Sequence, residues 1–373
     1  MNRNIKGIIN EVSKIPWKNN EYSKQNWGIW LHSISSYVGR IKPSFAHWLI
    51  EISTNKSDLV LDPFCGIGTI VLESNLMGRN VIGNDLNPYA YIITKAKFDR
   101  NGLQKEIEYL EALNLNSNLV NINKIPDWVK EFYHEKTLIE IITLRDNLLK
   151  NNKYFLLGCL LGIVHGHRKQ HLSIQTGYII PYLPNPKPPI EYREVIPRMI
   201  QKVKRMYKDD FPESNNSIIL NEDCRNLSIK SKTIDVILTS PPYYHTLDYV
   251  HTNRLRLWFA GINFEDQKKL TNILIQQRHS YLNEMKLVGN ELKRVLKDDG
   301  LIVFILGDVH FGKNSLNTAE DISNLYSEIG LETHGIVNDS IPASRTTIVK
   351  YGGVNAIKNK KEKLDRILFM TKN

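Results

Sequence analysis

Apolar positions in the first hundred residues of the chain alternate between strand-like runs and helical spacing. The expected elements are a helix over 44–53, a strand over 59–61, a helix over 70–77 that Gly78 ends, a strand over 80–83 that leads to Asp85, and a helix after Pro88. This order is typical of the start of a nucleotide-binding α/β sheet, in which a strand, a glycine turn and a helix are followed by a second strand that ends at an acidic residue.

The pattern of the middle of the chain is mainly helical. Between about residues 103 and 207 the apolar spacing predicts helices over 137–150 and 192–207. Four prolines within 182–189 predict an extended connector before the second of these helices. We interpret residues 101–215 as a mainly helical insertion in the sheet-forming part of the chain.

The α/β alternation returns after residue 216. The predicted elements are strands over 218–220 and 234–238, a helix over 284–296, and strands over 301–306, 331–337 and 366–370. With the first two strands these make about seven, mostly parallel, with helices between them. The prediction is an α/β catalytic core formed by residues 1–100 and 216–373.

Composition and charge narrow the class of protein. The 373 residues are 42% hydrophobic and 24% charged, as in ordinary globular proteins. No apolar run is long enough to span a bilayer, no secretory signal is visible, and three widely spaced cysteines suggest neither disulfides nor zinc, so a cytoplasmic location is expected. The net charge of +10 favours a polyanionic partner, although a lysine-rich composition from an AT-rich genome would also produce it.

The first candidate site is the turn Asp62-Pro-Phe-Cys-Gly-Ile-Gly-Thr69 after the first strand. Gly66 and Gly68 allow the backbone to approach a ligand, and the start of the next helix offers free amide groups. A tight turn without a ligand is the alternative. Asp85, at the end of the second strand, is placed to accept hydrogen bonds from ribose hydroxyls, or only to cap the helix after Pro88.

The second candidate site is Thr239-Ser-Pro-Pro-Tyr243, directly after the predicted strand 234–238. Pro241 and Pro242 stiffen the backbone and have no amide donors, which leaves their carbonyls to face a ligand. Ser240 adds a hydroxyl and Tyr243 an aromatic face. A proline pair alone indicates only an extended turn, but here it follows a strand of the same sheet as the glycine turn.

These two motifs together resemble the amino-methyltransferases of DNA. Ser-Pro-Pro-Tyr is typical of the cytosine-N4 branch, whereas adenine-N6 enzymes usually carry Asp or Asn in place of Ser240. The resemblance covers roughly residues 37–100 and 216–373, and implies a Rossmann-like class I methyltransferase that uses S-adenosylmethionine. It is weaker in the insertion, where the similar positions are Trp128, His134, Thr137, His165 and Gly166.

The resemblance also assigns roles to residues. It implies that the cofactor is bound by Asp62, Phe64, Gly66, Gly68, Thr69, Asp85, Asp223, Cys224 and Thr239, with Asp62 at the methionine end, Asp85 at the ribose, and Asp223 and Cys224 at the adenine. The catalytic residues would be Ser240, Pro241, Pro242 and Tyr243.

The chemistry of an exocyclic base amine explains this choice of residues. Its lone pair is delocalised into the ring, so it is a poor nucleophile until the Ser240 side chain and the Pro241 carbonyl hold its hydrogens and localise the pair. Tyr243 would stack on the base, which must leave the duplex to reach the site. A cytosine-C5 enzyme attacks the ring with a cysteine thiolate. None of the three cysteines, Cys65, Cys159 and Cys224, has the sequence setting expected for such a nucleophile.

Candidate DNA contacts are the basic residues of the insertion and of two later segments. Residues 165–210 hold nine Lys/Arg against four Asp/Glu. The candidates are His167, Arg168, Lys169, Arg254 and Arg345; Arg256 either faces the substrate or belongs to a helix packed through Leu255, Leu257 and Trp258. His167 and His171 are four apart, but no carboxylate or cysteine accompanies them, so no metal is expected.

The sequence therefore predicts a site-specific methyltransferase that acts on cytosine N4 of double-stranded DNA, with a restriction endonuclease as a possible partner. The alternatives are an adenine-N6 DNA methyltransferase, an RNA guanine-N2 methyltransferase, and a catalytically inactive DNA-binding homologue. The sequence shows no separate RNA-binding module before the core, and the intact motifs argue against an inactive protein.

Overall fold

The computed structural model describes most of the chain. The described residues are 3–24, 27–116, 120–176, 180–210, 217–242, 248–277, 279–311, 314–342 and 362–373. Two residues proposed from the sequence, Tyr243 of the proline motif and Arg345, lie outside these ranges.

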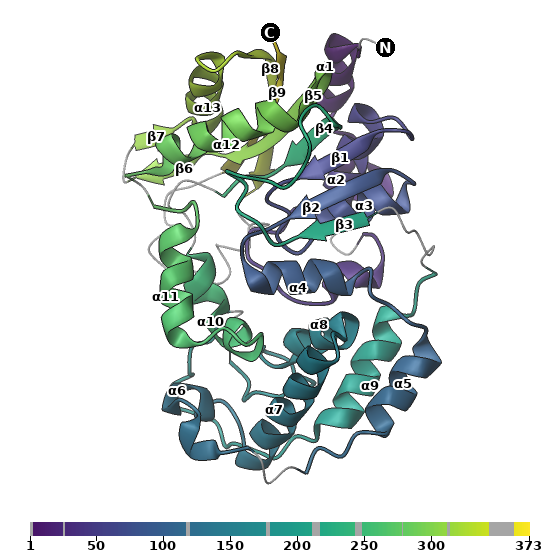
Figure 1. The fold of residues 1–373 in the computed structure, drawn as a ribbon, viewed down its shortest axis with the longest axis vertical. Helices are drawn as coiled ribbons and strands as arrows, with labels where there is room; N and C mark the ends of the chain where they lie inside the picture. The colour runs from purple at the N-terminus through teal and green to yellow at the C-terminus, as the bar shows by residue number, and fades with distance from the viewer. Residues whose placement is uncertain are drawn as a thin grey trace.

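A seven-stranded sheet forms the centre of the protein (Figure 1), in the order β3-β2-β1-β4-β5-β9-β8. Its strands are β1 (Leu59–Asp62), β2 (Asn80–Asn84), β3 (Ser217–Leu220), β4 (Ile234–Thr239), β5 (Leu296–Gly307), β8 (Leu331–Pro342) and β9 (Glu362–Lys372). The five strands from β3 to β5 pair in parallel, and β9 is antiparallel to both of its neighbours. The predicted Rossmann-like α/β fold is confirmed.

Helices cover both faces of the sheet, which explains why its central strands read as continuous apolar runs. Val236 and Leu238 pack on the face covered by α1 (Ile5–Ser13), α2 (Pro43–Ser53) and part of α3 (Thr69–Leu76). Ile237, between them, packs on the opposite face with α12 (Tyr281–Val295) and α13 (Thr318–Ser327). A short hairpin of β6 (Val309–Phe311) and β7 (Asn314–Leu316) stands apart from the main sheet.

The middle of the chain forms a helical layer beside the sheet (Figure 1). Its helices are α5 (Leu103–Glu111), α6 (Asp127–Lys130), α7 (Glu135–Lys150), α8 (Tyr154–Ile163) and α9 (Val195–Met206), joined by α10 (Tyr249–Phe259) and α11 (Phe264–Ile273). It meets the sheet layer through α4 (Pro88–Ala96), because Gly158 of α8 lies so close to Ala96 that a Cβ there would be 2.5 Å from that side chain. No described helix is long and apolar enough to cross a membrane.

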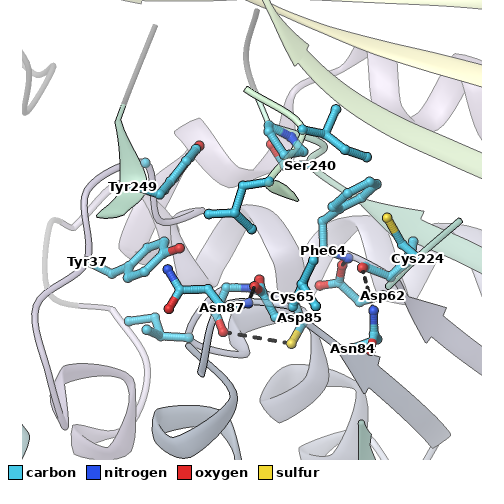
Figure 2. A pocket seen from close by; sticks show the side chains of 18 of the residues that line it. Tyr37, Asp62, Phe64, Cys65, Asn84, Asp85, Asn87, Cys224, Ser240 and Tyr249 are labelled. Carbon is cyan, nitrogen blue, oxygen red and sulfur yellow. Dashed lines mark hydrogen bonds between the residues drawn. The ribbon is translucent and has the colours of Figure 1, made fainter. Parts of the chain in front are cut away.

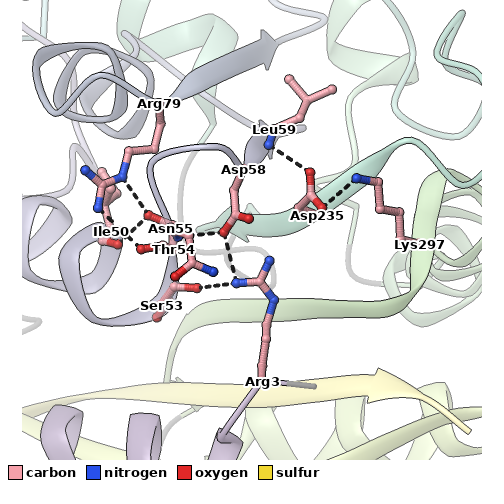
Figure 3. A network of polar contacts seen from close by, with 10 residues as sticks. All are labelled: Arg3, Ile50, Ser53, Thr54, Asn55, Asp58, Leu59, Arg79, Asp235 and Lys297. Carbon is pink, nitrogen blue, oxygen red and sulfur yellow. Dashed lines mark hydrogen bonds and ion pairs between the residues drawn. The ribbon is translucent and has the colours of Figure 1, made fainter. Parts of the chain in front are cut away.

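A polar network fastens the amino ends of β1 and β4, at the edge of the sheet away from the turns (Figure 3). The Arg3 guanidinium donates to the Asp58 carboxylate at 2.9 Å, just before β1. The Asp235 carboxylate accepts from the Leu59 amide at 2.9 Å and from the Lys297 ammonium at 2.6 Å. These bonds fix β1 relative to β4 and β5, and thereby the relative positions of the turns at the other ends of these strands.

Candidate active site

A pocket opens where β1, β2 and β4 end, and both sequence motifs contribute to it (Figure 2). Of the residues proposed from the sequence, the pocket is lined by Asp62, Phe64, Gly66, Thr69, Asp85, Asp223, Cys224, Ser240 and Pro242. Gly68, Thr239 and Pro241 are not among its lining residues. The carboxyl ends of parallel strands are the usual ligand-binding edge of such sheets.

The glycine turn is held by the acid at the end of the next strand. The Asp85 carboxylate accepts from the Gly66 amide at 2.8 Å and from the Asn87 amide at 2.9 Å. Gly66 has a φ of 53° and Gly68 a φ of 69°, a backbone region that favours glycine. Asp85 therefore shapes the glycine turn in addition to lining the pocket. Helix α4 (Pro88–Ala96) is capped instead by Asn87, whose side chain accepts from the Tyr89 amide, so the capping interpretation of Asp85 is wrong and its role toward the ribose stays a prediction.

Gly68 packs tightly against Thr94 of α4. A Cβ at this position would lie 2.6 Å from the Thr94 methyl group, and Thr94 donates its hydroxyl to the Gly66 carbonyl at 2.9 Å. The sequence-based assignment of Gly68 to the cofactor surface is corrected to a packing role, because α4 occupies the space next to its Cα.

We expect Gly68→Ala to lower the free energy of unfolding by about 2–4 kcal/mol, because it combines a left-handed φ with a clash against Thr94. Urea denaturation measures this change. Gly78→Ala is the matched control, since Gly78 has a φ of 73° but no atom within 4 Å of an added Cβ, so only the backbone cost applies. Equal losses in the two variants would contradict the packing role of Gly68.

Asp62 joins the two motifs at the floor of the pocket. Its carboxylate accepts from the Thr239 hydroxyl at 2.6 Å and from the Phe64 amide at 3.3 Å. Thr239 is fully buried and is a positioning residue for Asp62, which corrects its assignment as a cofactor contact. Burial raises the pKa of Asp62 to about 7 and that of Asp85 to about 6, against the hydrogen bonds that favour the ionised forms.

Asp223 and Cys224 form another part of the pocket lining. The Asp223 carboxylate pairs with the Arg225 guanidinium, whose other side pairs with Glu284. Burial opposes ionisation of Asp223, but the bonds from Arg225 outweigh it and lower the pKa of Asp223. Cys224 is buried, and burial raises the pKa of its thiol, so it presents an apolar surface to the pocket.

Ser240 and Pro242 bring the proline motif to the pocket. The Ser240 hydroxyl donates to the Ile305 carbonyl of β5 at 3.1 Å. The Pro242 carbonyl accepts from the Tyr281 hydroxyl at 2.9 Å. The expectation that both proline carbonyls are left to face a ligand is therefore wrong for Pro242, which is tied to α12.

An aromatic stack that was not predicted from the sequence forms one wall of the pocket. The Tyr37 ring stacks on Tyr249, the first residue of α10, with centroids 5.9 Å apart, and on Tyr89 of α4 at 6.1 Å. Tyr37 and Tyr249 both line the pocket (Figure 2). Tyr37 is the first residue of the region covered by the resemblance, but nothing in the sequence signalled that Tyr249 would meet it.

The candidate DNA contacts lie in different environments. His167, Arg168 and Lys169 are exposed in the segment after α8. Arg254 is half-buried on α10. Arg256 is 1% exposed and donates to the His165 carbonyl at 3.1 Å, so the idea that it faces the substrate is wrong.

The histidine pair after α8 does not resemble a metal site. The His171 ring accepts from the Arg168 amide at 3.0 Å, and burial lowers the pKa of His171 to about 3. Within the described ranges, no three His, Cys, Asp or Glu side chains are grouped in a way that could hold a metal ion.

The fold and this pocket define a Rossmann-like α/β architecture with a pocket at the carboxyl edge of its sheet, and comparison with known proteins finds similarity to DNA methylases. A family model for DNA methylases matches residues 11–96. The type II methyltransferase M.MjaII of Methanocaldococcus jannaschii is 28% identical over 34% of this chain and 22% of its own length. M.BsoBI of Geobacillus stearothermophilus is 23% identical over 65% of this chain and 55% of its own.

The similarity to DNA methylases agrees with the resemblance that the two motifs carry, and the family-model match covers the first of these motifs. The chain spans between about a fifth and just over half of the length of these two relatives. A shorter similarity, 42% identity over 14% of this chain and 16% of the other, links it to the tRNA (guanine(10)-N2)-dimethyltransferase of Methanothermobacter thermautotrophicus.

Proposed function

We propose that this protein transfers a methyl group from S-adenosylmethionine to the exocyclic N4 of cytosine in double-stranded DNA. The observation that carries the proposal is the Ser240 hydroxyl, which lies at the pocket with its proton directed to the Ile305 carbonyl. A hydroxyl whose proton is engaged in this way offers its oxygen lone pairs to an amine.

The pocket residues fit the proposed cofactor. Gly66 leaves space for a close approach, and the buried carboxylates of Asp62 and Asp85 suit a ligand with hydroxyl donors and positive charge. Phe64 and Cys224 add apolar surface for a flat ring. S-adenosylmethionine, when bound, would supply an electrophilic methyl group on a sulfonium.

The chain's own residues would prepare the amine. The Ser240 oxygen accepts one amine hydrogen, which draws the nitrogen lone pair out of conjugation and fixes the direction in which it points. The Pro241 carbonyl is the proposed acceptor of the second hydrogen. Positioning of this kind supplies about 7–11 kcal/mol of a barrier in favourable cases. The Tyr37–Tyr249 stack forms one side of the pocket.

Cytosine is favoured over adenine by the side chain at position 240. A serine at the start of this motif resembles the cytosine-N4 branch, while the adenine-N6 branch has Asp or Asn there. The similarity to a tRNA guanine-N2 enzyme makes RNA the second candidate substrate, but it covers 14% of this chain and is much shorter than the similarity to M.BsoBI.

The test is product analysis. Incubation with labelled S-adenosylmethionine and either duplex DNA or transfer RNA, followed by digestion and mass analysis, is expected to give N4-methylcytosine from DNA alone. N6-methyladenine without N4-methylcytosine would overturn the choice of base, methylguanine from RNA would overturn the choice of substrate, and cofactor binding without any product would indicate an inactive homologue.

The helical region 101–215 is proposed to contact DNA through exposed residues such as His167, Arg168 and Lys169, with the basic excess of this region favouring a phosphate backbone. The type II relatives suggest a restriction endonuclease as a partner in the cell.

A further inference from the structure

A second hollow lies on the other side of the start of α10. We call it the α10–α11 groove, and its main side chains are Trp128, Leu183, His251, Arg254, Phe264 and Lys268. Most of its lining residues come from α10 and α11, and Trp128 comes from α6. Figure 1 shows where these helices lie. Tyr249 faces the catalytic pocket while the next residues of the helix, Val250 and His251, line the groove. The first turn of α10 therefore contributes residues to both hollows.

The groove contains a cation held between aromatic rings. The Arg254 guanidinium lies 5.9 Å from the Trp128 ring centroid and 5.5 Å from that of Tyr182. It donates to the Pro181 carbonyl at 2.6 Å and contacts the His251 ring at 3.1 Å. None of its described partners is a carboxylate, so its charge is available to a ligand in the groove.

The rim of the groove exposes an aromatic ring with a second cation. Phe264 is 54% exposed, and the Lys268 ammonium lies 4.5 Å above its ring. Of the two acidic residues that line the groove, Asp248 uses its carboxylate to cap α10, where it accepts from the amides of Val250 and His251. The lining carries two cations, Arg254 and Lys268, and two acids, Glu131 and Asp248, and Lys268 also pairs with Glu265 at 3.1 Å. The groove thus places cations beside flat apolar surfaces without a net positive charge.

Aromatic faces interleaved with cations are what unstacked nucleobases bind, since every base has a π-face and carries a phosphate on either side. We propose that the α10–α11 groove binds an unstacked base of the substrate strand, next to the base that enters the catalytic pocket. This rests on the proposed function, because it assigns the groove to the same substrate. A base displaced from its neighbours by extrusion would need such a surface.

The experiment compares a dT oligonucleotide of about 20 nucleotides with an abasic oligonucleotide of equal length, using fluorescence anisotropy with the full chain. The wild type is expected to bind the dT oligonucleotide about tenfold more tightly. Phe264→Ala should remove most of this preference, and Lys268→Ala should weaken binding of both oligonucleotides about equally, since it removes only charge.

Matched controls separate the groove from the rest of the surface. Lys269→Ala removes the neighbouring exposed cation, and Leu287→Ala removes an exposed apolar side chain on α12; both should bind like the wild type. Equal binding of the two oligonucleotides by the wild type, or an unchanged preference in Phe264→Ala, would overturn the proposal. Base-dependent binding without any methylated nucleoside would leave the groove in place and refute the proposed reaction instead.

Discussion

Replacement of Ser240 by alanine is expected to lower turnover about 100-fold and to leave the affinity for S-adenosylmethionine within about twofold of the wild type. The alanine side chain cannot accept the amine hydrogen, so the lone pair of the target nitrogen stays delocalised. The bond from Ser240 to the Ile305 carbonyl is also lost, but β5 is fully buried at this point and holds the backbone in place.

Single-turnover kinetics with duplex DNA and calorimetric titration of the cofactor measure these two effects separately. Ser240→Thr is the control, because it retains a hydroxyl and should recover part of the turnover. A parallel loss of turnover and cofactor affinity in Ser240→Ala would show that Ser240 only shapes the loop.

The parts of this site that are local in sequence could be predicted from the sequence. The glycine turn follows β1 within a few residues, and its strand, turn and helix are encoded by short apolar runs and by glycines that need a positive φ. The seven-stranded sheet was predicted for the same reason, since strands buried on both faces stand out as apolar runs.

The parts that depend on distant contacts could not be predicted. Tyr37 meets Tyr249 only because α10 returns to the pocket after the helical region. The Pro242 carbonyl is occupied because Tyr281, on α12, reaches it. Arg256 reads as an exposed cation in sequence, yet α10 packs it against the segment after α8. No periodicity along the chain carries these pairings.

Replacement of Asp85 by asparagine is expected to weaken cofactor binding by at least about tenfold. The two carboxylate oxygens of Asp85 accept from different amides, those of Gly66 and Asn87, and face the pocket at the same time. An asparagine has one acceptor oxygen, and its NH₂ group would face one of these two amide hydrogens. The glycine turn would therefore shift, and the pocket would also lose the negative charge of the carboxylate.

The pH dependence of cofactor binding gives this prediction a second signature. Burial raises the pKa of Asp85 to about 6 and that of Asp62 to about 7, so the folded protein without ligand holds protons that the unfolded chain has lost. The free energy of unfolding should therefore fall as pH rises from about 4 to about 7. A cationic cofactor prefers the ionised carboxylates, so its affinity should rise over about pH 5 to 8.

Calorimetric titration of the cofactor across this range tests the assignment. Asp85→Asn should lose the lower part of the rise and keep the part that follows Asp62. Asp223→Asn is the matched control, because Arg225 lowers the pKa of Asp223 and takes it out of this range, so the variant should keep the full pH dependence. A wild-type affinity that does not change with pH would show that neither Asp62 nor Asp85 ionises on cofactor binding.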